Sequence, residues 1–122
     1  MLLGTPYIDL LLEAPEKKRV CVDWNGVIDT YDGGNYLDTE PRKGAKEFLK
    51  KLKDKYEVVI CTAADIEDAK AWFKENKLED YIDEITNTKL PAHVYVDDRA
   101  IVFDGSFEGL INKIMKYKAH WE

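Results

Sequence analysis

The sequence predicts an α/β domain in which helices cover a mainly parallel central sheet on both faces, giving three layers. Two observations support this fold class. Short apolar, β-branched runs alternate with segments of helical apolar spacing, and Gly, Pro, Asp and Asn separate them. At 122 residues the chain can form one core. We interpret 1–122 as one domain: an N-terminal extension or short helix (1–18), a motif-bearing core (19–104) and a C-terminal helix (105–122).

Five apolar runs are predicted strands: Val20–Trp24, Glu57–Thr62, Ile82–Thr86, His93–Val96 and the very short Ile101–Phe103. A parallel crossover needs about a dozen residues or more. The connection from Asp98 to Ile101 is shorter, so we expect an antiparallel hairpin onto an edge there. The connection from Thr86 to His93 is also shorter, and the sequence leaves its path open.

Three further segments have apolar residues at helical spacing and are predicted helices. Their apolar positions are Ala45, Phe48, Leu49 and Leu52, then Ile66, Ala69, Trp72 and Phe73, and finally Phe107, Leu110, Ile111, Ile114 and Met115. Pro41 is expected to open the first helix, and Asp65 to cap the second. Met1–Leu12 begins with helix-start residues and indicates a short helix or hydrophobic latch, which is compatible with a homodimer.

The net charge of -6 disfavours binding to nucleic acid, because a phosphate backbone attracts a basic surface. It does not exclude a phosphorylated substrate that is bound through a cation. No segment is long enough to span a membrane, and Met1–Leu12 lacks the positive start and cleavage site of a signal peptide. We therefore expect a cytoplasmic protein with no membrane partner.

Cys21 and Cys61 lie inside apolar runs, which indicates reduced thiols, with a disulfide as the less favoured alternative. Because side chains alternate along a strand, Cys21 would share a face with Asp23, and Cys61 would lie opposite Thr62. On this reasoning the two sulfurs point to different sides of the sheet.

Polar residues collect where the predicted strands end. Asp23 and Asn25 follow the first strand, Thr62 ends the second, and Asp97 and Asp98 follow the fourth. Ligands of open α/β sheets bind beyond these strand ends. Carboxylates gathered there repel one another unless a cation lies between them, and Mg2+ prefers such oxygen ligands. The sequence therefore predicts a magnesium site.

Four motifs, in order, resemble those of the haloacid dehalogenase (HAD) superfamily. Val-Cys-Val-Asp23-Trp-Asn25-Gly26-Val resembles the first motif, in which Asp-x-Asp-Gly follows an apolar strand, and Val-Val-Ile-Cys-Thr62 resembles the second. Lys89 fits the third motif, and Val-Tyr-Val-Asp97-Asp98 fits the fourth. The resemblance spans about two thirds of the chain. It implies a HAD-like, Rossmann-like core, and the short flap Asn25–Glu40 leaves no room for a cap domain.

The resemblance also implies a magnesium-dependent phosphohydrolase, a phosphomonoesterase that acts through an aspartyl-phosphate on Asp23. The implied catalytic residues are Asp23, Asn25, Thr62 and Lys89. The implied metal ligands are Asp23, the backbone carbonyl of Asn25, Asp97 and Asp98. The implied phosphate-binding residues are Trp24, Asn25, Gly26, Thr62 and Lys89. The substrate would be a small molecule, a nucleotide or a macromolecule that carries a phosphate.

Asn25 departs from the motif of family phosphatases, which have a second aspartate at this position for acid–base catalysis. An amide cannot carry a proton, and losing such help commonly costs roughly a hundredfold to ten-thousandfold in rate. Three interpretations follow: an engineered trap, a natural slow or non-hydrolytic member, or a proton supplied by Asp29 or Asp32 in the flap. We expect a phosphatase-type scaffold with impaired turnover, and Asn25 also favours the alternative of a catalytically degenerate binding or regulatory protein.

Several of these residues have simpler explanations. Considered alone, Thr62 is most simply a helix cap or a strand-end hydroxyl, and Lys89 is most simply a solvated lysine. Arg99 is expected to pair with Asp97 or Asp98 in a structural role. A signalling receiver domain uses the same residue types, but in a different order along the chain, because there the acidic pair precedes the Thr and the Lys.

Overall fold

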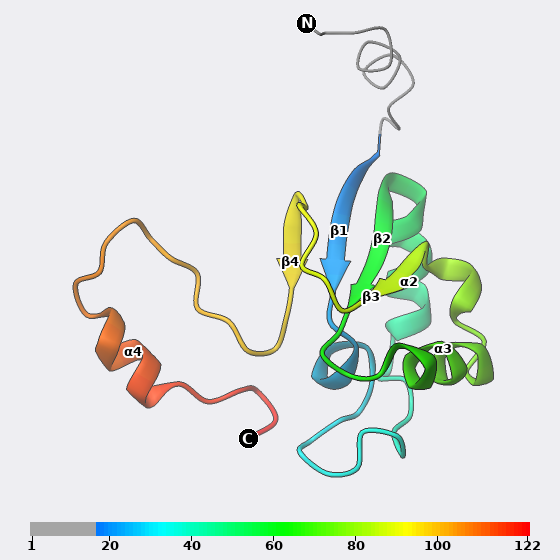
Figure 1. Ribbon diagram of the computed structural model, residues 1–122, viewed down its shortest axis with the longest axis horizontal. Helices are drawn as coiled ribbons and strands as arrows, with labels where there is room; N and C mark the ends of the chain where they lie inside the picture. Colours follow the sequence, from blue (N-terminus) through cyan, green and yellow to red (C-terminus); the bar gives the residue numbers. More distant parts are fainter. Residues whose placement is uncertain (1–16) are drawn as a thin grey trace, which may run out of the picture.

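Four parallel strands form the central sheet in the computed structural model, which describes residues 17–122 (Figure 1). They are β1 (Lys18–Val22), β2 (Tyr56–Cys61), β3 (Glu84–Thr86) and β4 (Val94–Val96), in the order β3-β2-β1-β4. The predicted α/β class with a parallel sheet is confirmed, and residues 17–122 contain no cap domain. The helix or latch predicted in Met1–Leu12 lies outside the described residues.

Helices α2 (Ala45–Lys55) and α3 (Ile66–Glu75) cover one face of the sheet. The strand register places Val20 beside Val58, so alternate side chains of β1 and β2 project to that face. There they join Leu49 of α2 and Phe73 of α3 in one buried core. Burial of these apolar side chains is the main favourable contribution to the free energy of folding on this face of the sheet.

The helix starts follow local backbone chemistry. Asp65 caps α3 as expected, since its side chain accepts a hydrogen bond from the Asp68 N–H at 3.0 Å. Pro41 does not open α2, and this expectation was wrong. Pro41 instead forms an antiparallel bridge with Asp29, and Gly44 turns the chain with φ of +86° before the helix begins at Ala45.

The second face of the sheet carries an extended crossover, residues 87–93, instead of a helix (Figure 1). This segment leads from β3 at one edge to β4 at the other and so settles the path that the sequence left open. Arg19 of β1 holds it at two points: its guanidinium donates to the Pro91 carbonyl at 3.0 Å, and its own carbonyl accepts from the His93 N–H at 2.8 Å. An extended chain covers enough distance for this short parallel crossover without a helix.

Cys21 and Cys61 lie on the same face, so the prediction that their sulfurs point apart was wrong. The register pairs Cys21 with Val59, and Cys61 follows two residues later on the same side of β2. Both thiols are free. Burial raises the pKa of the Cys21 thiol to about 12, and its hydrogen bond with Cys61 acts in the same direction.

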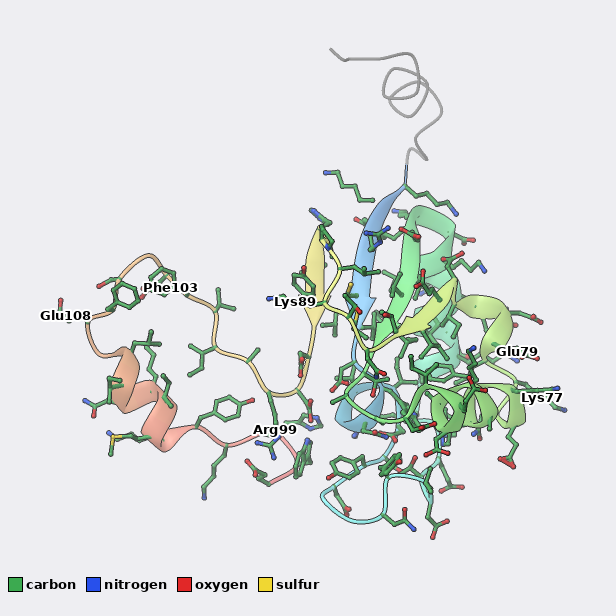
Figure 2. All side chains as sticks on the ribbon, in the orientation of Figure 1. Lys77, Glu79, Lys89, Arg99, Phe103 and Glu108 are labelled. Carbon is green, nitrogen blue, oxygen red and sulfur yellow. The ribbon has the colours of Figure 1, made fainter. Side chains whose placement is uncertain are left out.

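The chain after β4 leaves the sheet. Ile101–Phe103 forms no strand, so the predicted hairpin is wrong, and Val102 is 88% exposed. The last helix, α4, is confined to Leu110–Lys116 and lies apart from α2 and α3 (Figure 1). Phe103 and Glu108 mark the loop that leads away from the sheet (Figure 2). Within residues 17–122, no helix has the length and apolar character needed to cross a membrane.

Candidate metal and phosphate site

The site lies where the strand order reverses. β2 and β3 extend the sheet on one side of β1, whereas β4 lies on the other side. Ligands of parallel α/β sheets bind at such a point, beyond the carboxyl ends of the strands. Asp23 directly follows β1, and its backbone N–H donates to the Val96 carbonyl of β4 at 2.8 Å. This bond holds Asp23 beside Asp97 and Asp98.

Three carboxylates meet at this point. One oxygen from each of Asp23, Asp97 and Asp98 lies within 4.8 Å of the other two. Asp23 and Asp98 are half-buried, and Asp97 is exposed. Positions that the sequence separates by more than 70 residues are therefore brought together, as the predicted parallel strands required.

The pKa values of these groups show the cost of gathering three acids. Burial raises the pKa of Asp23 to about 8, and a hydrogen bond with Asp98 and the charges of Asp97 and Asp98 act in the same direction. Burial also acts against ionised Asp98, but its pKa is lowered on balance by hydrogen bonds with Trp121 and Asp23. Without a cation, Asp23 therefore retains the proton and Asp98 carries the charge.

The donor set fits a magnesium ion. The three side chains supply only carboxylate oxygens, which are the ligands that Mg2+ prefers. A divalent cation would remove the repulsion that raises the pKa of Asp23. The fourth predicted ligand, the carbonyl of Asn25, belongs to the turn that begins immediately after Asp23.

A tight turn, Trp24–Ile28, follows β1 and arranges the predicted phosphate-binding residues. β1 ends at Val22, so Trp24 belongs to the turn and not to the strand as predicted. The Trp24 side chain is fully buried against Trp72 and Phe73, and its backbone N–H donates to Asp23 at 2.9 Å. Any phosphate contact by Trp24 is consequently limited to its backbone.

Gly26 is required by space as well as by conformation. Its φ is +94°, and a Cβ there would collide with the carboxylate of Asp98 and contact Trp121. The Gly26 N–H donates to Asp29 at 2.8 Å, and its carbonyl oxygen lies 2.7 Å from Nε2 of His120. Gly26 thus lets the turn pass directly beside the acidic cluster.

Thr62 and Lys89 reach the same cavity by different routes. Thr62 is buried at the end of β2, where its hydroxyl accepts from the Ala64 N–H at 3.0 Å and keeps its proton available for donation. Lys89 is exposed on the crossover (Figure 2), and its ammonium lies 4.8 Å from the ring centroid of Tyr95. A cation–π interaction with Tyr95 therefore places the Lys89 ammonium at the cavity wall.

One cavity of about 1250 Å3 joins these groups. All six side chains with a predicted catalytic or metal-binding role line it: Asp23, Asn25, Thr62, Lys89, Asp97 and Asp98. The other two predicted residues, Trp24 and Gly26, lie in the turn behind it.

The C-terminal tail contributes residues that the sequence did not reveal. Trp121 lines the cavity, and its indole N–H donates to the Asp98 carboxylate. The ring of Trp121 also meets Tyr31 edge to face at 5.3 Å. A single tryptophan at position 121 carries no spacing signal, so only the fold could place it here.

Arg99 joins the tail instead of the acidic cluster. Its guanidinium pairs with Glu122 at 3.0 Å and lies 4.7 Å from the Trp121 ring centroid. The predicted ion pair with Asp97 or Asp98 is therefore absent, although the backbone N–H of Arg99 donates to Asp97. Figure 2 shows Arg99 where the chain after β4 approaches the tail.

Comparisons with known proteins support the fold alone. No family model matches the chain, and no curated protein matches it. A solved structure of a conserved protein from Bacteroides thetaiotaomicron is similar, with a TM-score of 0.56 and 20% sequence identity. The match covers 82% of this chain and 90% of that one.

Proposed function

We propose that this chain is a magnesium-dependent phosphohydrolase that forms an aspartyl-phosphate on Asp23. One observation carries the proposal: three carboxylates from two strand ends share a cavity with a buried hydroxyl and a lysine. The four HAD-like motifs of the sequence contribute all of these groups. Without a cation, gathering three carboxylates costs free energy, as the raised pKa of Asp23 indicates.

Each residue has a role that follows from its position. Asp23 would attack the phosphorus atom of a phosphorylated substrate, forming a bond between its carboxylate oxygen and phosphorus. Thr62 would donate its hydroxyl proton in a hydrogen bond to a phosphoryl oxygen, and Lys89 would balance negative charge at the cavity wall. Asp23, Asp97, Asp98 and the Asn25 carbonyl would hold Mg2+, which supplies Lewis-acid stabilisation of phosphoryl charge.

A cytoplasmic location agrees with this proposal, because both cysteines are free and such thiols persist in reducing compartments.

The contact between Trp121 and Asp98 places an aromatic side chain at the cavity edge, where a substrate larger than phosphate itself would meet it.

A second candidate function is binding without turnover. Asn25 lines the cavity at the position where the family's phosphatases have an acid–base aspartate, and this observation favours a degenerate regulatory or binding protein. The two candidates differ in what happens to a phosphoryl group after it enters the site.

The test is phosphate release from a panel of phosphomonoesters, with and without MgCl2, by the wild-type chain, Asn25→Asp and Asp23→Ala. We expect slow release that requires magnesium and is abolished by Asp23→Ala. An Asn25→Asp chain that is well folded should be faster by roughly a hundredfold to ten-thousandfold. If no form releases phosphate from any ester or from acetyl phosphate, hydrolysis is wrong and the binding role is preferred.

A further inference from the structure

Asp29 is a fully buried carboxylate directly behind the cavity. It lies four residues after Asn25, and its oxygens accept four hydrogen bonds. The donors are the Asn25 amide at 2.6 Å, the Gly26 N–H at 2.8 Å, the Tyr31 N–H at 3.1 Å and the Thr39 hydroxyl at 2.7 Å. A buried acid with this many donors is fixed in place.

This network determines which end of the Asn25 amide faces the cavity. The Asp29 oxygens accept hydrogen bonds from all four of these donors, and Asn25 is one of them, so Asn25 presents its amide nitrogen to Asp29. The amide oxygen is the end that remains for the cavity, which Asn25 lines. Position 25 thus offers an acceptor with no transferable proton, and Asp29 requires a donor there.

Four other titratable groups in or near the cavity do not replace an acid at position 25. Asp29 is enclosed behind Asn25 with its oxygens occupied, and Asp32 is exposed in the flap and does not line the cavity. His120 uses Nε2 on the Gly26 carbonyl. His93 lines the cavity, but it precedes β4 and stacks on Tyr56, a strand's length from Asp97.

We propose that the pairing of Asn25 with Asp29 restricts the site to phosphoryl donors whose leaving group departs without a proton, namely acyl phosphates, other phosphoanhydrides and aryl phosphates with a weakly basic phenolate. The inference rests on the proposed function and specifies its substrate class. Alkyl phosphomonoesters are poor substrates on this account, because an alkoxide is a strongly basic leaving group that needs an acid in the transition state.

The step balances without any other reactant. The Asp23 carboxylate oxygen forms a bond to phosphorus, and the bond between phosphorus and the leaving oxygen breaks. The leaving group takes the electron pair and departs as a carboxylate, phosphate or phenolate anion. Water then attacks the aspartyl-phosphate, which restores the Asp23 carboxylate, yields inorganic phosphate and releases a proton to solvent.

The experiment compares kcat/KM of the wild-type chain for acetyl phosphate, p-nitrophenyl phosphate and glycerol phosphate in saturating MgCl2. We expect turnover of the first two, with glycerol phosphate lower by on the order of a hundredfold or more. This comparison needs no variant. Three values within about tenfold of one another would overturn the inference and leave the proposed function intact.

A double exchange, Asn25→Asp with Asp29→Asn, provides the matched variant. The exchange keeps one donor and one acceptor across the 2.6 Å contact, whereas Asn25→Asp alone sets two carboxylates against each other. It should raise the ratio of glycerol phosphate turnover to acetyl phosphate turnover by roughly a hundredfold. An unchanged ratio in a folded double variant would overturn the inference, and no release from any donor by wild type would overturn both proposals.

Discussion

Asp23 has a raised pKa because the chain buries it beside two other carboxylates, Asp97 and Asp98. The sequence located the acidic residues correctly, since the carboxyl ends of parallel strands meet at one edge of a sheet. It could not supply the contact with Trp121 that helps to lower the pKa of Asp98, because Trp121 reaches the site through folding of the tail. Trp121 does not stand at a spacing that indicates a site.

The raised pKa of Asp23 predicts a specific pH dependence of stability. The pKa of an unfolded aspartate is about 3.9, and burial raises the pKa of folded Asp23 to about 8 in the metal-free protein. Between these values the folded chain binds the extra proton, so Asp23 makes the free energy of unfolding fall as pH rises. The slope is at most about 1.4 kcal/mol per pH unit, and the contribution is lost by about pH 8.

Urea denaturation at pH 5 and pH 8 in EDTA, with wild type and Asp23→Asn, measures this effect. The wild-type chain should lose more unfolding free energy between the two pH values than the variant, which has no proton to lose there. MgCl2 should stabilise wild type more strongly at pH 8, because the metal binds deprotonated Asp23. Equal pH dependence in both proteins would contradict the assignment.

Gly26 gives a second prediction at this scale. Gly26→Ala and Gly105→Ala both force alanine into a left-handed conformation, with φ of +94° and +96°, at a cost of about 1–2 kcal/mol each. At Gly105 nothing lies within 4 Å of the added Cβ, whereas at Gly26 it meets Asp98. Gly26→Ala should therefore destabilise more and also abolish magnesium binding, and equal effects on both measurements would count against the proposed site.

At the scale of elements, the sequence predicted regular segments better than connections. The core strands have strong apolar patterns, so β1 and β2 were found within two residues of their observed bounds, and α3 begins directly after its predicted cap, Asp65. Ile101–Phe103 has strand composition, but the Tyr117 hydroxyl bonds the backbone on either side of Arg99, at Asp98 and Ala100. Such tertiary contacts override local β propensity. The prediction for the two cysteine sulfurs was wrong for a related reason. The register between β1 and β2 could not be inferred from the strand sequences alone.

The C-terminal tail is predicted to support the metal site. Trp121→Phe keeps an aromatic ring against Tyr31 but removes the N–H that donates to Asp98. Losing such an orienting bond should weaken magnesium binding by roughly ten- to a hundredfold, as measured by calorimetry. Glu122→Gln is the control, because it weakens the exposed pair with Arg99 and leaves an amide oxygen that can accept from the Ala119 N–H. Unchanged affinity in Trp121→Phe would show that the tail merely lies near the site.

At the scale of the whole molecule, stability and chemistry occupy different parts of the chain. The buried core is formed mainly by residues from β1, β2, α2 and α3, with Trp24 and Ile28 of the turn, whereas α4 exposes most of its apolar side chains, including Ile111 at 69%. The sheet and two helices therefore act as the scaffold on whose strand ends the site is built. The homodimer suggested by Met1–Leu12 stays a prediction.

Two isoleucine truncations test this division. Ile60→Ala removes a fully buried side chain and should cost about 2–5 kcal/mol of unfolding free energy. Ile111→Ala changes a largely exposed side chain and should stay within about 0.5 kcal/mol of wild type. Urea denaturation gives both values, and a large loss in Ile111→Ala would mean that α4 packs more closely in solution than this structure indicates.

The central claim is that Asp23 accepts a phosphoryl group in a magnesium-dependent step. The most direct measurement is intact-mass analysis, followed by peptide mapping, after incubation with acetyl phosphate in MgCl2 or EDTA. We predict one added phosphoryl group, located on Asp23, that requires magnesium and is absent from Asp23→Asn. Modification at another residue, or no modification of a chain that binds magnesium, would contradict the account.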